Sequence, residues 1–149
     1  MAEEARREIL WGLDQADVVK ISDEEVEFLW NCAPEEGAGR LLEEHGVKLA
    51  MVTLGAKGCY LRNGKAAVFV PAPGVEPVDT TGAGDIFGGS AVGRLLELGK
   101  CPQELEQKEL EDIAAFAVTA ASLSTQRPGG IPSIPDRQVV MARITEGKE

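Results

Sequence analysis

Hydrophobic and polar positions along the chain form blocks that predict helices and strands in alternation. Short apolar runs are typical of buried strands, and the dipeptide Asn63-Gly64 between two such runs is a strong hairpin signal. The strands are expected at 16–21, 47–54, 60–62 and 66–70.

Helices are predicted where apolar residues recur at helical spacing and where the residues at either end are ones that favour a helix start or a helix end. Ser22 and Glu25 have the spacing of a capping box, Pro34 suits a first helical turn, and His45-Gly46 suits a helix end. The helices are expected at 2–14, 22–30, 34–45, 86–98, 113–124 and 136–144, with 104–111 as a solvated helical face. This alternation predicts a layered α/β fold, with a mostly parallel sheet, one antiparallel hairpin and flanking helices.

Composition narrows the possible partners. The 149 residues are 44% hydrophobic and 27% charged, as in an ordinary globular domain, and the net charge of −10 disfavours nucleic acid and anionic membranes. No apolar run approaches the roughly 18 residues of a membrane span. The scattered Cys32, Cys59 and Cys101 fit reduced thiols of a cytoplasmic protein, and the single histidine, His45, fits a helix end better than catalysis.

The run 78–85, Val-Asp-Thr-Thr-Gly-Ala-Gly-Asp, is the most informative stretch of the chain. It places Gly82, Gly84 and the unsatisfied amides of a starting helix beside the carboxylate of Asp85. A helix amino end attracts anions, so this turn can hold a phosphoryl group while Asp85 accepts the proton of an attacking hydroxyl. Taken alone, the motif is equally compatible with an ordinary glycine-rich turn that carries an acidic residue.

Two common phosphate-binding motifs are excluded. No Gly-Lys-Ser/Thr sequence closes the run, so it is not a Walker A loop. Phe87 stands where the dinucleotide-binding fingerprint requires its third glycine.

A second glycine-bearing segment, 52–58, follows the second predicted strand. Open α/β sheets bind ligands at the carboxyl ends of their strands, so Thr53, Gly55 and Gly58 can border a nucleotide. A turn that merely needs glycine explains the same residues.

Ser22 and Glu25 also admit two roles, a helix cap and a site near a metal ion, which do not exclude each other. Lys20, just before them, can meet a phosphate, although a lysine stem lying along apolar surface with its charge in water is the more ordinary interpretation.

In their order and spacing, these segments resemble the ribokinase-like PfkB family of carbohydrate kinases. The resemblance spans residues 16–135, and the amino-acid sequence of residues 16–29 is especially similar to that of bacterial fructokinases. It implies an ATP-dependent sugar kinase, in which Asp85 is the catalytic base and the amides of Gly82, Ala83 and Gly84 form the anion hole.

The same resemblance assigns the remaining site residues. The nucleotide would contact Thr53, Gly55, Gly58, Val118, Ala121 and Gly130. Glu25 would orient water around Mg²⁺, and Asp79 and Thr81 would share a monovalent cation such as K⁺ with the loop 122–135. The family often has asparagine where this chain has Val118, which puts a polar contact to adenine in doubt, and a small residue such as alanine where it has Gly130.

A full kinase of this family is about twice as long, and its first half carries the sugar-binding residues and a lid. Residues 1–149 are therefore expected to form a single nucleotide-binding domain that corresponds to the C-terminal half, inactive alone. Expected partners are ATP and a sugar, with a missing N-terminal half or a second copy of the chain. The alternative is a nucleotide-binding or self-associating module without turnover.

Overall fold

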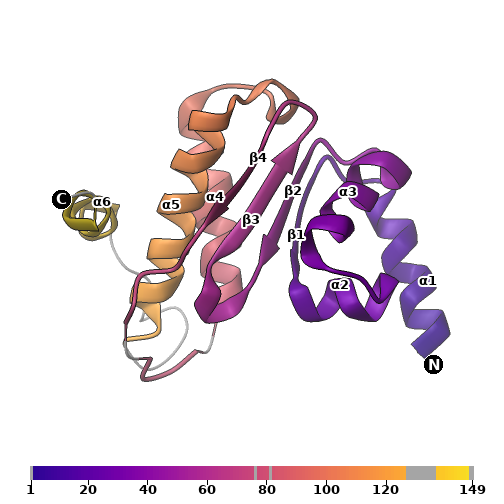
Figure 1. Ribbon diagram of the computed structural model, residues 1–149, viewed down its shortest axis with the longest axis horizontal. Coiled ribbons are helices and arrows are strands. Elements are labelled where there is room, and N and C mark those ends of the chain that lie inside the picture. Colours follow the sequence, from indigo (N-terminus) through magenta and orange to yellow (C-terminus); the bar gives the residue numbers. More distant parts are fainter. Residues whose placement is uncertain (1, 76, 81, 127–136, 148–149) are drawn as a thin grey trace.

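A four-stranded sheet lies between two layers of helices in the computed structural model, which describes residues 2–75, 77–80, 82–126 and 137–147 (Figure 1). The strands are β1 (Val18–Ser22), β2 (Leu49–Thr53), β3 (Cys59–Asn63) and β4 (Ala67–Val70). The helices are α1 (Ala2–Leu13), α2 (Asp23–Trp30), α3 (Pro34–His45), α4 (Ala83–Leu98), α5 (Gln107–Ser124) and α6 (Arg137–Gly147).

The sheet has the order β1-β2-β3-β4, so each described strand pairs with its neighbour in sequence. β1 and β2 are parallel, whereas β2–β3 and β3–β4 are antiparallel. The predicted α/β layering and the hairpin at Asn63-Gly64 are confirmed. The sequence predicted a mostly parallel sheet, whereas only one pair of the described strands, β1–β2, is parallel. The short connection 54–58 returns the chain directly beside β2, so β3 runs antiparallel to it.

Side chains of β2 and β3 alternate between two hydrophobic cores. On one face, Met51 and Leu61 pack with α4 and α5, and on the other, Ile21 and Val52 pack with α2 and α3. The helices therefore form one layer on each face of the sheet. The site described below lies on the α4–α5 side.

The helix boundaries follow capping chemistry. The Ser22 side chain accepts a hydrogen bond from the Glu25 amide (3.1 Å), and the Glu25 carboxylate accepts one from the Ser22 amide (3.3 Å). Gly46 ends α3 in the left-handed conformation, as expected for the His45-Gly46 pair. The segment expected as a separate helical face at 104–111 is divided between a 3₁₀ turn at 102–104 and the start of α5.

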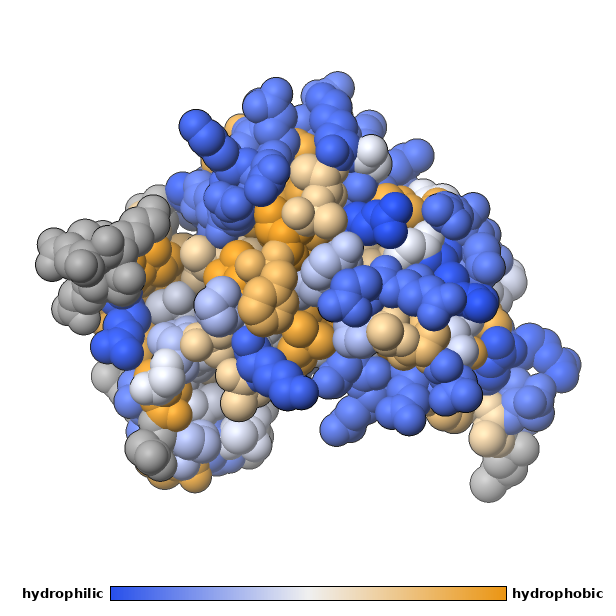
Figure 2. Space-filling view, viewed as in Figure 1, coloured by the Kyte–Doolittle hydropathy of each residue, from blue (hydrophilic) through white to orange (hydrophobic). Residues whose placement is uncertain are grey.

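Hydrophobic side chains are exposed on one face of the molecule. Figure 2 shows them gathered in the middle of the face, over the sheet and between hydrophilic margins. Among the described residues, exposed large hydrophobic side chains also include Phe69 of β4 (55% exposed) and Leu96 of α4 (74% exposed), which belong to different layers. In the described ranges, no helix has the length and apolar character to cross a membrane.

Candidate active site

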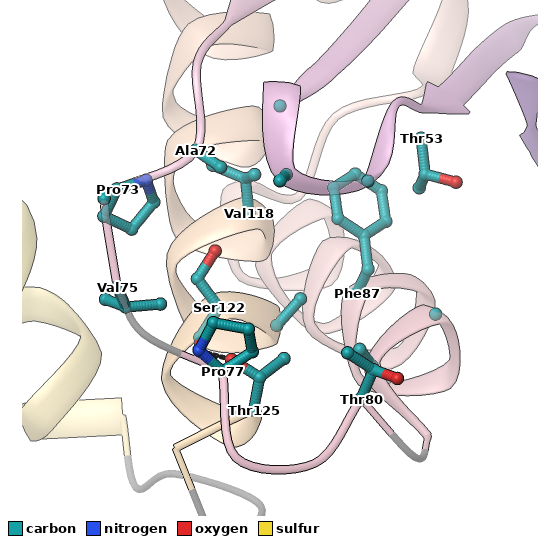
Figure 3. A pocket seen from close by; sticks show the side chains of 17 residues that line it. Thr53, Ala72, Pro73, Val75, Pro77, Thr80, Phe87, Val118, Ser122 and Thr125 are labelled. Carbon is teal, nitrogen blue, oxygen red and sulfur yellow. Dashed lines mark hydrogen bonds between the residues drawn. The ribbon is translucent and has the colours of Figure 1, made fainter.

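A cavity of about 330 Å³ opens where β2 ends, α4 begins and α5 approaches its last turn (Figure 3). Its size is at the lower end of the range for small-ligand sites. It is lined by Thr53, Gly55, Ala56, Gly58, Ala72, Pro73, Gly74, Val75, Pro77, Thr80, Ala83, Gly84, Phe87, Val118, Ala121, Ser122 and Thr125.

The turn after β2 forms one border of this cavity. Thr53 is the last residue of β2, and a 3₁₀ turn at Gly55–Lys57 leads to Gly58. Gly55 and Gly58 have φ of +60° and +127°, which favour glycine. A Cβ on Gly58 would also overlap the carbonyl oxygen of Val70, so the glycine here is required by the close approach of the backbone that leaves β4.

The amino end of α4 forms the second border. Gly82 precedes the helix in the left-handed conformation (φ +75°), and Ala83 and Gly84 line the cavity. The Ala83 amide donates to the Thr80 carbonyl (3.2 Å), so this amide of the predicted anion hole is bonded within the turn. Asp85 is exposed in the first helical turn.

An apolar wall completes the cavity. Val118 and Ser122 lie one turn apart on α5, and Pro73 and Val75 lie opposite them on the segment that leaves β4 (Figure 3). Phe87 of α4 is buried. Among the side chains of this wall, apolar groups outnumber hydroxyls, which suits the flat faces of a nucleobase better than recognition of its polar edge.

The end of α5 is tied to the segment that precedes α4. The Thr125 carbonyl accepts hydrogen bonds from the amides of Val78 (2.6 Å) and Asp79 (2.9 Å), while the Thr125 hydroxyl donates to the Ser122 carbonyl (2.6 Å). These bonds place Asp79 beside the final turn of α5; its role at a cation site stays a prediction.

The structure brings most of the predicted nucleotide residues together. Thr53, Gly55, Gly58, Val118 and Ala121 share the cavity with Ala83 and Gly84. Gly130 and Thr81 lie outside the described residues.

Other predicted residues do not line the cavity. Gly82 and Asp85 lie at the start of α4 beside it, and Glu25 is engaged in the cap of α2. Within the described part of the chain, no group of three His, Cys, Asp or Glu side chains is placed to hold a metal ion.

Sequence reasoning missed Phe87 and the lining role of residues 72–75 and 77. The available signal was the spacing of Pro71, Pro73 and Pro77, which prevents a regular strand and leaves an extended segment at the surface.

Comparisons with known proteins concern the family and the fold of the chain. The profile of the pfkB family carbohydrate kinases matches residues 1–137. Fructokinase-1 of Oryza sativa subsp. japonica is 40% identical over 142 residues, covering 93% of this chain and 43% of the relative. The chain thus spans less than half the length of this relative.

Two solved structures have the same fold over most of the chain. A fructokinase from Vibrio cholerae O395, with fructose, ADP and calcium bound, superimposes with a TM-score of 0.82 at 31% identity, covering 94% of this chain and 44% of that one. A ribokinase from Thermotoga maritima gives a TM-score of 0.75 at 34% identity, covering 89% and 43%. The ribokinase-like fold expected from the sequence is therefore confirmed.

Proposed function

The chain belongs to the pfkB family of carbohydrate kinases, and from this membership we propose that it is the nucleotide-binding part of a fructokinase-like enzyme. The reaction is transfer of the γ-phosphoryl group of ATP to a sugar hydroxyl. One observation carries the proposal: two glycine-bearing turns, which contribute Gly55 and Gly58 and Ala83 and Gly84, border a single cavity with an apolar wall.

ATP fits the arrangement in one orientation. The adenine lies against Val118 and Ala121, and the phosphates extend toward the turns at Thr53 and at the start of α4. The dipole and unsatisfied amides of a helix amino end favour the negative charge of the phosphates. The apolar wall replaces the polar contact to adenine that asparagine often makes in this family.

Asp85 is proposed as the base that accepts the proton of the sugar hydroxyl. Its exposed position in the first turn of α4 keeps it within the same turn as Gly84, which borders the cavity. The amides of Gly82 and Gly84 stabilise the charge on the transferring phosphoryl group, where one preorganised donor contributes about 3 kcal/mol to lowering the barrier. Because the Ala83 amide is bonded to Thr80, its part in this cradle requires a small change in the turn.

Mg²⁺ would be carried mainly by the nucleotide. Magnesium usually keeps several waters and binds one or two carboxylates together with phosphates, and the described lining of this cavity contains no acidic side chain. Glu25 is proposed to orient water around Mg²⁺ with the part of its carboxylate not used in the cap. Asp79 and Thr81 are proposed to hold K⁺.

Full turnover requires a sugar site and a lid that excludes water. We assign residues 1–149 to the C-terminal half of the enzyme and place the protein in the cytoplasm, as the reduced cysteines suggest. Fructose is the proposed sugar because the Oryza sativa relative and the Vibrio cholerae structure above are fructokinases.

Calorimetric titration tests the nucleotide site. MgATP at micromolar to millimolar concentration is expected to release heat with one site per chain, while adenosine alone should bind more weakly because it lacks the phosphates. Absence of heat at millimolar MgATP would contradict the proposal.

A second candidate is a nucleotide-binding or self-associating module without turnover. Among the described strands, β1 pairs on one side only, which leaves a free edge that a second copy can extend. Light scattering distinguishes this candidate, since a monomeric mass at high concentration would count against self-association.

A further inference from the structure

We propose that α6 positions the amino end of α4 and that Val140 is the residue through which it does so. Val140 belongs to a small buried cluster that also contains Ile86, the residue next to Asp85. This role rests on the proposed nucleotide function and deepens it, because it concerns what holds the proposed base and the neighbouring amides in place. Val140 does not line the cavity, so it is a positioning residue.

The cluster is distinct from the two cores that pack against the sheet. Its buried members come from three helices and are Ile86, Phe116, Ala120 and Val140. Val140 is 1% exposed, so α6 contributes a fully enclosed side chain. α6 itself packs on α5 (Figure 1). The cluster therefore links α6 to both helices that border the cavity.

The sequence of α6 presents one apolar face to this cluster. Val140, Met141 and Ile144 all take part in it, and residues four apart lie on the same side of a helix. The adjacent Val139 is 50% exposed. Two neighbouring valines of one helix thus differ in their surroundings and not in their chemistry.

Ile86 anchors the first turn of α4. Among residues 83–86 it is the one that is buried, and Asp85 beside it is exposed. The other buried residues of α4 recur every four positions and pack in the core on the sheet; they are Phe87, Ala91 and Leu95. Ile86 lies about 200° around the helix from Gly84, because each residue turns an α-helix by about 100°. The cluster therefore supports the first turn from the side opposite Gly84.

α5 depends less on the cluster than the first turn of α4 does. Phe116 and Ala120 each lie two positions from Val118, and so on the far side of α5 from that wall residue. Val118 and Ala117 belong to the core on the sheet, which holds α5 independently. A defect at Val140 should therefore disturb the start of α4 more than the apolar wall.

Shortening Val140 removes the support behind Ile86. Protein interiors are close-packed, and neighbouring groups relax in part into the space that deleted methyl groups leave. Asp85 directly precedes Ile86, so a movement of Ile86 redirects the Asp85 carboxylate and the amide of Gly84. Phosphoryl transfer depends mainly on positioning and charge stabilisation, so such a displacement weakens the phosphate end of the site first.

Val140→Ala in the purified chain tests this role by calorimetry and by amide chemical shifts. We expect the affinity for MgATP to fall about threefold to tenfold, the range for residues that act through a packed neighbour, and the affinity for adenosine to stay unchanged. In the chain without nucleotide, the amide signals of Gly84 and Asp85 should move. Those of Gly55 and Gly58, which lie on the other border of the cavity, should not.

Val139→Ala is the matched control, because it makes the same chemical change at the exposed neighbour. Its MgATP affinity and its amide signals at Gly84 and Asp85 should equal those of the wild type. Ile86→Val trims the cluster from the α4 side and should weaken MgATP in the same direction by a smaller factor. It also keeps the role testable if Val140→Ala does not fold, which circular dichroism and thermal unfolding verify.

The outcomes separate a positioning role from a purely stabilising one. Variants at Val140 and Ile86 that melt earlier, yet keep the wild-type MgATP affinity and the wild-type signals at Gly84 and Asp85, would overturn the role of α6 and leave the nucleotide site standing. Equal effects of Val139→Ala and Val140→Ala would also overturn it. A wild type that does not bind MgATP would overturn the nucleotide site, and the amide signals of the free chain would then decide the role of Val140 alone.

Discussion

Gly58 has the most constrained backbone at the mouth of the cavity. Its φ of +127° is a conformation that glycine adopts readily and other residues rarely adopt. A Cβ there would lie 2.7 Å from the Pro71 Cα. Gly55 also has a positive φ, but the space around its Cβ position is open. The two glycines therefore serve the turn for different reasons.

Alanine substitutions separate these reasons. Gly58→Ala should lower the free energy of unfolding by about 3 kcal/mol, since it adds an overlap to backbone strain, and Gly55→Ala by about 1 kcal/mol from strain alone. Gly64→Ala, where φ is ordinary and the space is open, should change little. Urea denaturation measures all three. Equal losses at Gly55 and Gly58 would contradict the close approach to Pro71.

Cys59 provides a prediction about pH. Burial raises the pKa of its thiol to about 12, whereas the thiol of an unfolded chain ionises near pH 8.5. The unfolded state therefore loses the proton first, so the free energy of unfolding should fall as the pH rises from about 9 to 12. Cys59→Ala should reduce this slope relative to the wild type, and denaturation at several alkaline pH values measures the difference.

Thiol labelling checks the same burial. In the folded protein, the exposed Cys101 should react with a thiol reagent first and Cys32 more slowly, because partial burial and Glu36 raise the pKa of Cys32. Cys59 should react only after unfolding. Rapid labelling of all three thiols would contradict the described core.

The sequence predicted the site residues that a backbone conformation or a familiar motif requires. Gly55, Gly58 and Gly84 belong to this class, and the structure brings them to one cavity. Phe87 was noticed only as a departure from a glycine fingerprint. The position of the Lys20 ammonium beside Gly84 depends on how α4 packs over β1. Local sequence carries no signal for that packing.

A paired ionic contact joins α4 to α5. The Arg94 guanidinium donates to both carboxylate oxygens of Asp112, from Nε at 3.0 Å and from Nη2 at 2.8 Å. Arg94 also donates to Glu97 (2.9 Å), and the bond to Asp112 contributes most to raising the pKa of Arg94. Both helices also contribute residues to the cavity, at the start of α4 and near the end of α5.

Asp112→Asn should lower the free energy of unfolding by about 1 kcal/mol, because a bidentate, half-buried pair is at the upper end for surface ion pairs. Glu97→Gln, which removes the more exposed partner, should have a smaller effect. Thermal unfolding compares the two variants. A larger loss for Glu97→Gln would show that Asp112 does not hold the helices together.

Helix and strand positions were more predictable than their ends. α3 has its predicted bounds, since Pro34 and Gly46 mark both ends. α4 begins three residues before the predicted Ile86, because Gly82 adopts the left-handed conformation and starts the helix within the motif. The direction of β3 could be inferred from the short connection before it, but periodicity alone does not specify strand direction.

The molecule as a whole corresponds to less than half of its fructokinase relatives. Its β1 edge has no partner among the described strands, and α4 exposes Val92 and Leu96. We expect negligible phosphorylation of fructose by the isolated chain in a coupled assay, because the proposed sugar site and lid belong to the other part of the enzyme. Robust turnover that Asp85→Asn abolishes would contradict this incompleteness and support the assigned chemistry.

Amide chemical shifts of the ¹⁵N-labelled chain, recorded during titration with MgATP, test the nucleotide site most directly. The account predicts that the largest changes occur at Gly55, Gly58 and Gly84 and along Val118–Thr125, with little change in α2 and α3. Changes confined to α2 and α3, or no change at millimolar MgATP, would contradict it.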